Sequence, residues 1–117
     1  MNDKTPFSIL FVCLGNICRS PMAESIFQKI VVEKNQSRCF EIDSAGIIDV
    51  HEGELADRRM RFFAEKRGYE LTHRSRPIRS VDFDAFDLIL CMDHQNWNAL
   101  RMLANSDEHK KKIHFVT

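Results

Sequence analysis

The feature that most constrains the fold is an apolar run that ends directly at Cys13. Residues 7–12 read F-S-I-L-F-V, which is typical of a central parallel strand covered on both faces. Helix signals begin at Ser20 and Pro21, after which apolar residues recur at helical spacing as far as Asn35. A buried strand that leads into a helix within one short loop predicts a parallel sheet with helices on its faces.

The rest of the chain alternates strand and helix signals in the same way. The further predicted elements are strands at 39–43, 86–92 and 113–116 and helices at 55–67 and 94–104. The small residues at 44–46 predict a turn after the second strand. We therefore expect one α/β domain with a four-stranded parallel sheet, flanked by helices and connected by right-handed crossovers.

Charge and hydropathy exclude several classes of protein. Lys and Arg number 17 and Asp and Glu number 17, so no chain-wide basic field exists to bind nucleic acid or an anionic membrane. No apolar run reaches the roughly 18 residues of a membrane span, and the first residues do not resemble a signal peptide. We expect a cytoplasmic protein without nucleic-acid or membrane partners.

The four cysteines are Cys13, Cys18, Cys39 and Cys91. Because no signal peptide is recognised, reduced thiols are expected rather than disulfides. Cys39 and Cys91 fall in predicted strands and are expected in the core. The sequence contains no C-x2-C or H-x3-H pair, so we expect no structural metal site.

The loop between the first strand and the first helix carries residue types suited to an anion. The N–H groups of residues 14–19 can point inward and the helix N-terminus adds positive charge, so phosphate or sulfate would find a ring of donors. Gly15 lets the chain turn where a Cβ would clash, and Asn16 tolerates a left-handed backbone while its amide ties the loop to a neighbour. Arg19 offers a planar fork that matches two phosphate oxygens.

Cys13 stands at the start of this loop, where the same donors and Arg19 favour its thiolate form. Ser20 can donate its hydroxyl to the sulfur, which makes the sulfur a better leaving group when water cleaves a phosphocysteine intermediate. A fixed ring of donors with Arg19 stabilises the dispersed negative charge of phosphoryl transfer. These residues predict a cysteine-dependent phosphatase that needs no metal or cofactor.

The run V-C-L-G-N-I-C-R-S-P-M-A-E at 12–24 resembles the signature of the low molecular weight protein tyrosine phosphatases. The likeness continues in D-S-A-G at 43–46, H-E-G-E-L-A-D-R-R-M at 51–60, H-R-S-R-P at 73–77 and F-D-L-I-L-C-M-D at 86–93. The resemblance implies a flavodoxin-like fold and hydrolysis of phosphotyrosine proteins or small aryl phosphates.

The resemblance also implies roles for individual residues. The implied set comprises Cys13, Arg19 and Ser20 as catalytic residues, Leu14, Gly15, Asn16, Ile17 and Cys18 as the phosphate-binding loop, Ser44 and His73 as the supporting hydrogen-bonding shell, and Val50, His51 and Asp93 as the cleft rim. Without the resemblance, His73 reads as a surface histidine. Cys18 either pairs with Cys13 on oxidation, as the resemblance implies, or is simply a small buried residue. Val50 stands where the family often carries a bulky aromatic, which predicts weaker stacking on a substrate ring.

The sequence departs from the family's pattern in one respect. Family members are longer and carry their general acid as an Asp in an Asp-Pro-aromatic segment, followed by a final helix. No Asp-Pro pair occurs in these 117 residues. We expect residues 1–117 to form a single phosphatase domain that lacks the acid loop and the last helix and has low activity. The surface that the missing helix leaves bare predicts self-association or a rearranged packing.

Two other functions stay open. The absent acid favours a non-catalytic module that binds phosphate or another oxyanion. An arsenate reductase of the same fold would need further mobile cysteines to relay a disulfide, and Cys91 lies in a predicted buried strand with no second cysteine nearby.

Overall fold

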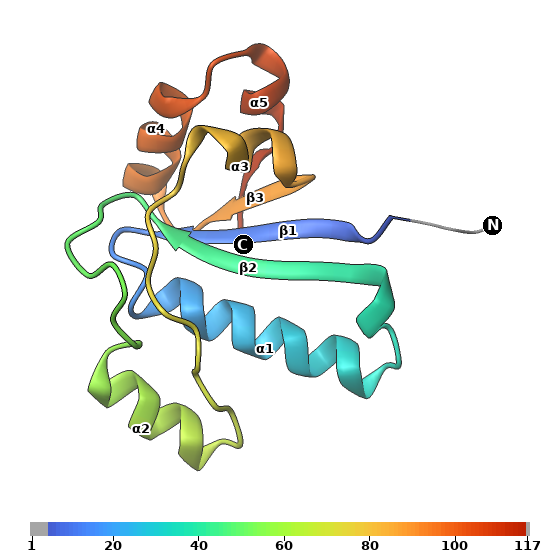
Figure 1. Cartoon of the computed structure of the whole chain (residues 1–117), viewed down its shortest axis with the longest axis vertical. Coiled ribbons are helices and arrows are strands. Elements are labelled where there is room, and N and C mark those ends of the chain that lie inside the picture. Colours follow the sequence, from blue (N-terminus) through green and yellow to red (C-terminus); the bar gives the residue numbers. More distant parts are fainter. Residues whose placement is uncertain (1–4, 117) are drawn as a thin grey trace.

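The computed structural model describes residues 5–116 and shows a parallel sheet between two layers of helices (Figure 1). The predicted domain limits at 1 and 117 lie outside the described residues. The strands are β1 (Phe7–Cys13), β2 (Phe40–Gly46), β3 (Leu88–Cys91) and β4 (Ile113–Phe115). The helices are α1 (Arg19–Glu33), α2 (Arg58–Lys66), α3 (Ser80–Ala85), α4 (His94–Leu103) and α5 (Asp107–Lys111), with a 3-10 turn at Ser37–Cys39.

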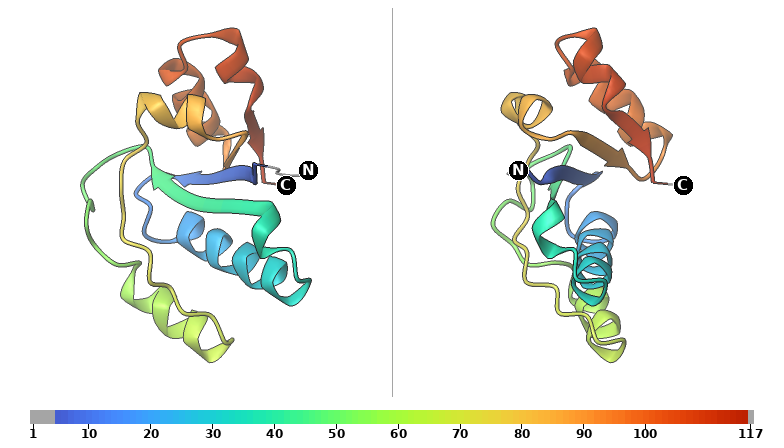
Figure 2. Two further views of the ribbon diagram at one scale, coloured as in Figure 1. Left: turned by 45° about the vertical axis from the view of Figure 1, so that its right-hand side comes forward. Right: turned by 90° about the vertical axis from the view of Figure 1, so that its right-hand side faces the viewer.

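The strand order is β2-β1-β3-β4, and every neighbouring pair is parallel. Helix α1 packs against β1 and β2 on one face, whereas α3 and α4 lie on the other face (Figure 2). The predicted α/β class and four-stranded parallel sheet are therefore confirmed. Within residues 5–116, no helix combines the length and the apolar character that a membrane crossing requires.

Strand β1 is central and is buried at every position after Phe7. Its register pairs Cys13 with Gly46 of β2 and Val12 with Cys91 of β3. The carboxyl ends of these three strands therefore meet at one edge of the sheet, which is where parallel α/β sheets place their ligand sites. The loop that follows Cys13 starts at this edge.

The main core fills the space between the sheet and the second helical layer. Its buried members are Leu10, Val12, Ala45, Phe83, Phe86, Ile89, Cys91, Leu100 and Ile113. A smaller cluster of Ala56, Ala64 and Leu71 lies under α2. The sheet is thus covered by apolar side chains on the side away from α1, which fixes β1 and the loop that it carries.

Two predictions about the second strand are wrong. Residues 44–46 were predicted as a turn, but they belong to β2 and pair with residues 11–13 of β1. Small residues are needed there because all three are buried, not because the chain turns. Cys39 was predicted in the core but lies exposed in the 3-10 turn before β2.

Two short helices were not predicted, and both depend on side chains that cap their first turn. In α3 the Asp82 carboxylate accepts the backbone N–H of Arg79 at 2.7 Å. In α5 the Ser106 hydroxyl accepts the backbone N–H of His109 at 3.1 Å. Helices of six and five residues are too short to show the apolar periodicity on which the sequence predictions relied.

The core predicts a large effect for Leu100→Ala. Leu100 is fully buried in the main cluster, so truncation removes apolar contacts and leaves a cavity. We expect a loss of about 2–5 kcal/mol in the free energy of unfolding, measured by urea denaturation. Met102→Ala on the same helix is the control, since Met102 is 86% exposed and its truncation should change stability little. Equal losses in the two variants would contradict this packing.

Candidate active site

A pocket of about 290 Å³ opens at the carboxyl end of β1. Its walls are Cys13, Leu14, Gly15, Ile17, Cys18, Arg19, Ile48 and His51. Cys13 is only 3% exposed, at the point where β1 passes into the loop. The structure therefore brings the predicted nucleophile, four of the five predicted loop residues and Arg19 together around one cavity.

The fifth loop residue, Asn16, faces the protein interior and is 1% exposed. Its backbone φ of 58° lies in the left-handed region, which Asn tolerates better than most residues. The side-chain N–H groups donate to the hydroxyls of Ser20 at 2.8 Å and Ser44 at 3.0 Å. Asn16 therefore joins the loop to the start of α1 and to β2.

The oxygen atoms of Asn16 bind a third segment, residues 73–76. The Oδ1 atom accepts the backbone N–H of Arg76 at 3.0 Å and lies 2.8 Å from His73 Nε2. Because Oδ1 can only accept, Nε2 carries the proton in this pair. The Asn16 carbonyl accepts the Ser75 hydroxyl at 2.6 Å. All hydrogen-bonding groups of the Asn16 side chain are thus satisfied within the protein.

The sulfur of Cys13 lies 3.0 Å from the hydroxyl oxygen of Ser20. That oxygen already accepts an N–H of Asn16, so its own hydrogen is free to point at the sulfur. The geometry therefore allows the Ser20 hydroxyl to donate to a Cys13 thiolate. A hydrogen bond from a buried hydroxyl stabilises a thiolate and so makes the sulfur a better leaving group.

Arg19 lines the pocket and forms an ion pair with Asp93, which lies just after β3. Its Nη2 lies 3.0 Å from Asp93 Oδ2, while Asp93 Oδ1 accepts the backbone N–H of Asn96 at 2.9 Å. That backbone hydrogen bond, helped by Arg19, lowers the pKa of Asp93. Asp93 therefore stays ionised and holds Arg19 near the pocket.

Two residues predicted for the cleft rim behave differently from each other. His51 lines the pocket, and its Nδ1 lies 3.0 Å from Glu54 Oε1. Val50 is 65% exposed and does not line the pocket. Ile48, which the sequence analysis did not select, contributes an apolar side chain to the pocket wall.

Cys18 is a pocket residue whose thiol pKa is raised by burial and by Asp57. Its redox pairing with Cys13 stays a prediction.

A group of ionisable residues, of which Glu24 is buried and Asp43 and His73 are partly buried, adjoins the Asn16 network. His73 Nδ1 lies 3.5 Å from Glu24 Oε1 and 3.4 Å from Asp43 Oδ1. Burial raises the pKa of Glu24 to about 7 and lowers the pKa of His73. Burial therefore favours the neutral forms of both side chains. The Ser44 hydroxyl donates to Glu24 at 2.5 Å and so links this group to Asn16.

Glu24, Asp43 and His73 also form the group with the best spacing for a metal ion in the described part of the chain. Each offers one ligand atom, and these atoms lie within 4.8 Å of one another. However, the Arg76 guanidinium lies 3.1 Å from Asp43 and 3.0 Å from Asp82. A cation is thus already supplied by the protein, and its charge disfavours a metal ion at the same place.

The sequence analysis missed several residues that hold the site. These are Glu24, Gly46, Ser75 and Arg76. Three of them stand within the segments 43–46 and 73–77 that carried the family resemblance, and Glu24 closes the segment 12–24. That clustering was the available signal, because nothing in their residue types alone points to the loop.

Steric crowding identifies Gly46, rather than Gly15, as the glycine that the loop requires. A Cβ on Gly15 would meet only side chains, those of His51 at 3.0 Å and Ile17 at 3.8 Å. A Cβ on Gly46 would meet the backbone of residues 14–16 at 3.0–3.1 Å. A side chain can move aside, but the loop backbone cannot do so without losing its shape. The expected clash at Gly15 is therefore a weaker constraint than the one at Gly46.

Gly46→Ala should damage the site more than Gly15→Ala. For Gly46→Ala we expect a loss of about 1–3 kcal/mol in the free energy of unfolding, because the added methyl overpacks the loop. We also expect weaker binding of inorganic phosphate, measured by titration calorimetry. Gly15→Ala is the matched control, with a smaller loss of stability. If the two variants bind phosphate equally, the contact between Gly46 and the loop does not shape the site.

The raised pKa of Glu24 predicts a dependence of stability on pH. A carboxyl whose pKa rises from 4.5 to about 7 on folding stabilises the protein below about pH 4.5 and loses that contribution as the pH rises through 7. The difference in free energy of unfolding between the unmodified chain and Glu24→Gln should therefore fall by about 1 kcal/mol from about pH 6 to pH 8. The lowered pKa of His73 acts in the opposite direction, and this comparison largely cancels it. A difference that is constant with pH would show that Glu24 is ionised throughout.

The sequence pattern of the family described as "Low molecular weight phosphotyrosine protein phosphatase" matches residues 8–117. Proteins of that name include one from Sus scrofa, 42% identical over 105 residues that cover 90% of this chain and 66% of the relative. One from Rattus norvegicus is 43% identical over 110 residues, which cover 93% and 70%. The chain thus spans about two thirds of the length of these relatives.

Solved structures agree with the sequence matches. A protein tyrosine phosphatase from Entamoeba histolytica, with Hepes in its active site, has a TM-score of 0.90 and 42% identity and covers 93% of this chain and 69% of its own. A structure of an arginine phosphatase from Drosophila has a TM-score of 0.85 and 35% identity, and the match covers 92% of this chain and 69% of the Drosophila chain. Because the family's sequence pattern matches residues 8–117, nearly the whole chain, the chain belongs to the low molecular weight phosphotyrosine protein phosphatase family.

Proposed function

We propose that the chain hydrolyses phosphotyrosine in proteins, and small aryl phosphates, through a phosphocysteine on Cys13. The observation that carries this proposal is the placement of the Cys13 sulfur beside the pocket, 3.0 Å from a Ser20 hydroxyl that is free to donate to it. Loop N–H groups and Arg19 supply the positive surroundings that a phosphate dianion needs. The residues at 14–18 serve as the phosphate-binding loop, and Ser44 and His73 keep that loop in shape.

The reaction proceeds in two displacements. The Cys13 thiolate attacks phosphorus, a sulfur–phosphorus bond forms, and the bond from phosphorus to the phenolic oxygen breaks. The phenolate takes a proton and leaves. Water then attacks the phosphocysteine, the sulfur–phosphorus bond breaks, and inorganic phosphate departs with the thiolate restored. Ser20 stabilises the thiolate in both steps, and Arg19 binds two of the phosphoryl oxygens.

The walls of the pocket favour an aromatic substrate. Leu14, Ile17 and Ile48 present apolar side chains beside Cys13, which suit the ring of phosphotyrosine. The Drosophila relative is described as an arginine phosphatase, and a phosphoarginine substrate would place a polar guanidino group against the same walls. None of the residues that line this pocket is a carboxylate, so the pocket offers no acidic partner for that group.

Within the described residues 5–116, the polypeptide offers no suitable acid to donate a proton to the leaving phenolate. Asp93 does not line the pocket but contacts Arg19, and its lowered pKa and this contact keep it ionised, so it is a poor donor. The sequence contains no Asp-Pro pair. We propose that residues 1–117 act as one phosphatase domain of low activity towards phosphotyrosine, since a positioned acid contributes roughly 10² to 10⁴ in rate.

Leaving-group dependence tests this proposal. The 117-residue polypeptide should cleave p-nitrophenyl phosphate, whose leaving group needs little protonation, roughly 10² or more times faster than a phosphotyrosine peptide. A phosphoarginine peptide should be cleaved more slowly still. Cys13→Ser should abolish all turnover, while Cys39→Ser, a change at an exposed thiol away from the pocket, should not. Turnover by Cys13→Ser would overturn the proposed mechanism.

Trapping the intermediate separates an enzyme from a module that only binds an oxyanion. Acid quenching during turnover of p-nitrophenyl phosphate should leave phosphate attached to Cys13, detected by mass spectrometry. An adduct-free protein that binds phosphate without turnover would support the binding module.

Arsenate reduction is disfavoured because burial raises the pKa of the Cys91 thiol to about 11, which makes that thiol a poor relay nucleophile. The mechanism needs a reduced Cys13, so we also propose a cytoplasmic location. Self-association stays a prediction.

A further inference from the structure

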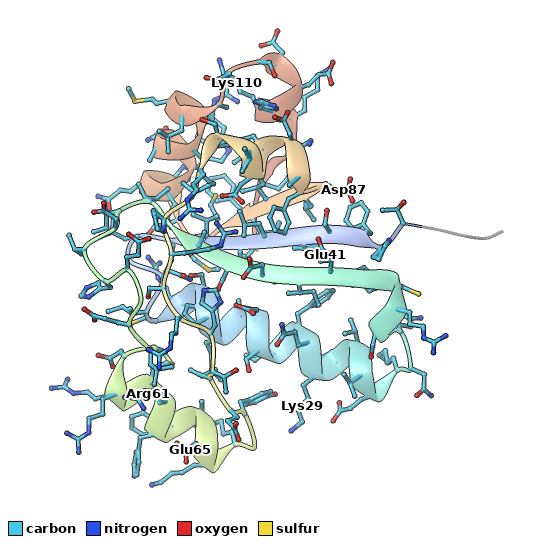
Figure 3. The ribbon with its side chains drawn as sticks, viewed as in Figure 1. Lys29, Glu41, Arg61, Glu65, Asp87 and Lys110 are labelled. Atoms are coloured by element: carbon cyan, nitrogen blue, oxygen red, sulfur yellow. The ribbon has the colours of Figure 1, made fainter. Side chains whose placement is uncertain are left out.

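A second groove adjoins the candidate active site and shares two of its walls. The groove has a volume of about 560 Å³ and includes Ile17 and His51, which also line the pocket beside Cys13. It extends from there to the first turn of α2, where Arg61 projects from the helix (Figure 3). A peptide whose phosphotyrosine enters the pocket would therefore pass the groove within a few residues.

Three arginines, Arg58, Arg61 and Arg74, line this groove. Among residues 5–116, none of the three lies within 4 Å of a carboxylate, whereas Arg19, Arg76 and Arg79 have acidic partners. Other exposed arginines, such as Arg59, are also unpaired, and what sets these three apart is that they line one groove. The groove therefore has a small excess of positive charge, with three guanidinium groups against the two carboxylates of Glu54 and Asp57.

The two carboxylates in the groove are engaged elsewhere. Glu54 lies 3.0 Å from His51 Nδ1. Asp57 accepts the backbone N–H groups of Arg59 and Met60, at 3.1 and 3.2 Å, and so caps α2. Both carboxylates keep their negative charge, but each is held by these contacts and neither lies within 4 Å of the three arginines, so the guanidinium groups stay available to a ligand.

Two of the arginines are held in place by single hydrogen bonds to the backbone. Arg61 Nε donates to the Ala56 carbonyl at 2.9 Å, and Arg74 Nη1 donates to the Gly53 carbonyl at 2.8 Å. A guanidinium has five N–H donors, so most donors of each side chain are left for a ligand. Groups that are already positioned lose less conformational entropy when they bind.

We propose that this groove binds acidic side chains that flank the phosphotyrosine of a protein substrate. The inference rests on the proposed phosphatase function, which places the phosphotyrosine in the adjoining pocket. Carboxylates match the planar fork of arginine and can take two hydrogen bonds from it. The groove thereby selects phosphotyrosines that have Asp or Glu nearby, and the apolar pocket selects the ring.

Paired phosphopeptides test the proposal. One peptide carries Asp and Glu on both sides of the phosphotyrosine, and the other carries Asn and Gln at the same positions. The dissociation constant of each is measured by calorimetry on Cys13→Ser, so that turnover does not interfere. We expect the acidic peptide to bind about tenfold more tightly at low salt, and the preference to shrink as salt screens the exposed charges.

The variants Arg58→Ala and Arg59→Ala, each made on Cys13→Ser, distinguish binding in the groove from the general attraction of an acidic peptide to positive charge on α2. The two arginines are consecutive exposed residues on α2, but only Arg58 lines the groove. Arg58→Ala should reduce the preference for the acidic peptide at least about threefold, as expected for an exposed ion pair of up to roughly 1 kcal/mol. Arg59→Ala should leave the preference intact. Arg61→Ala and Arg74→Ala should act as Arg58→Ala does.

Two results would overturn the inference. One is equal affinity for the acidic and the amide peptides, and the other is an equal loss of preference in Arg58→Ala and Arg59→Ala. Failure of the proposed phosphatase function is a separate result, seen as no release of phosphate from p-nitrophenyl phosphate by the chain with Cys13 intact. Because the peptide affinities are measured without turnover, the two failures can be told apart.

Discussion

The candidate site depends on the buried side chain of Asn16. A loop that presents its N–H groups to an anion must forgo hydrogen bonds with the rest of its own backbone, so its shape has to be fixed by other means. Asn16 provides this by bonding to Ser20 in α1, Ser44 in β2 and the segment 73–76. Its left-handed φ of 58° turns the backbone while the amide faces inward. One residue thus ties the loop to three parts of the fold.

The sheet makes those bonds possible because its register sets where the three parts meet. Cys13 pairs with Gly46 at the end of β2, and Gly46 itself bonds to the segment around Arg76 through its backbone N–H at 2.8 Å. The absence of a side chain at Gly46 lets the loop lie directly over β2. Strand pairing, a glycine and an asparagine therefore act together, and none of them alone would position the sulfur.

Local sequence patterns predicted the parts of the fold that are formed locally. The apolar run of β1 and the periodicity of α1 were sufficient for the first βα unit, and the alternation of strands and helices was sufficient for the sheet. The short helices α3 and α5 were missed because their caps, Asp82 and Ser106, stabilise single turns without an apolar stripe. The buried end of β2 was mistaken for a turn because its small residues are chosen for packing.

The site shows the same division between local and distant contacts. The loop from Cys13 to Ser20 was recognisable because nucleophile, glycine, asparagine and arginine stand within one short stretch. Ser75 and Arg76 were not, since each contacts Asn16 across about sixty residues of sequence and neither has a residue type that demands such a partner. His73 was assigned only through the family resemblance, and the structure places it half-buried against Asn16 and Glu24.

Arg19 illustrates why the charge of the site must be considered as a whole. In the structure its guanidinium bonds to Asp93, and a bound phosphate dianion would compete with this single carboxylate for the same donors. The competition favours phosphate, because the dianion carries more charge and also receives the loop N–H groups, whereas Asp93 is half-exposed and screened by water. Asp93 cannot follow Arg19 into the pocket, since its other oxygen caps α4. In the proposed phosphatase, the ion pair with Asp93 would therefore hold Arg19 beside the pocket at little cost to the binding of phosphate.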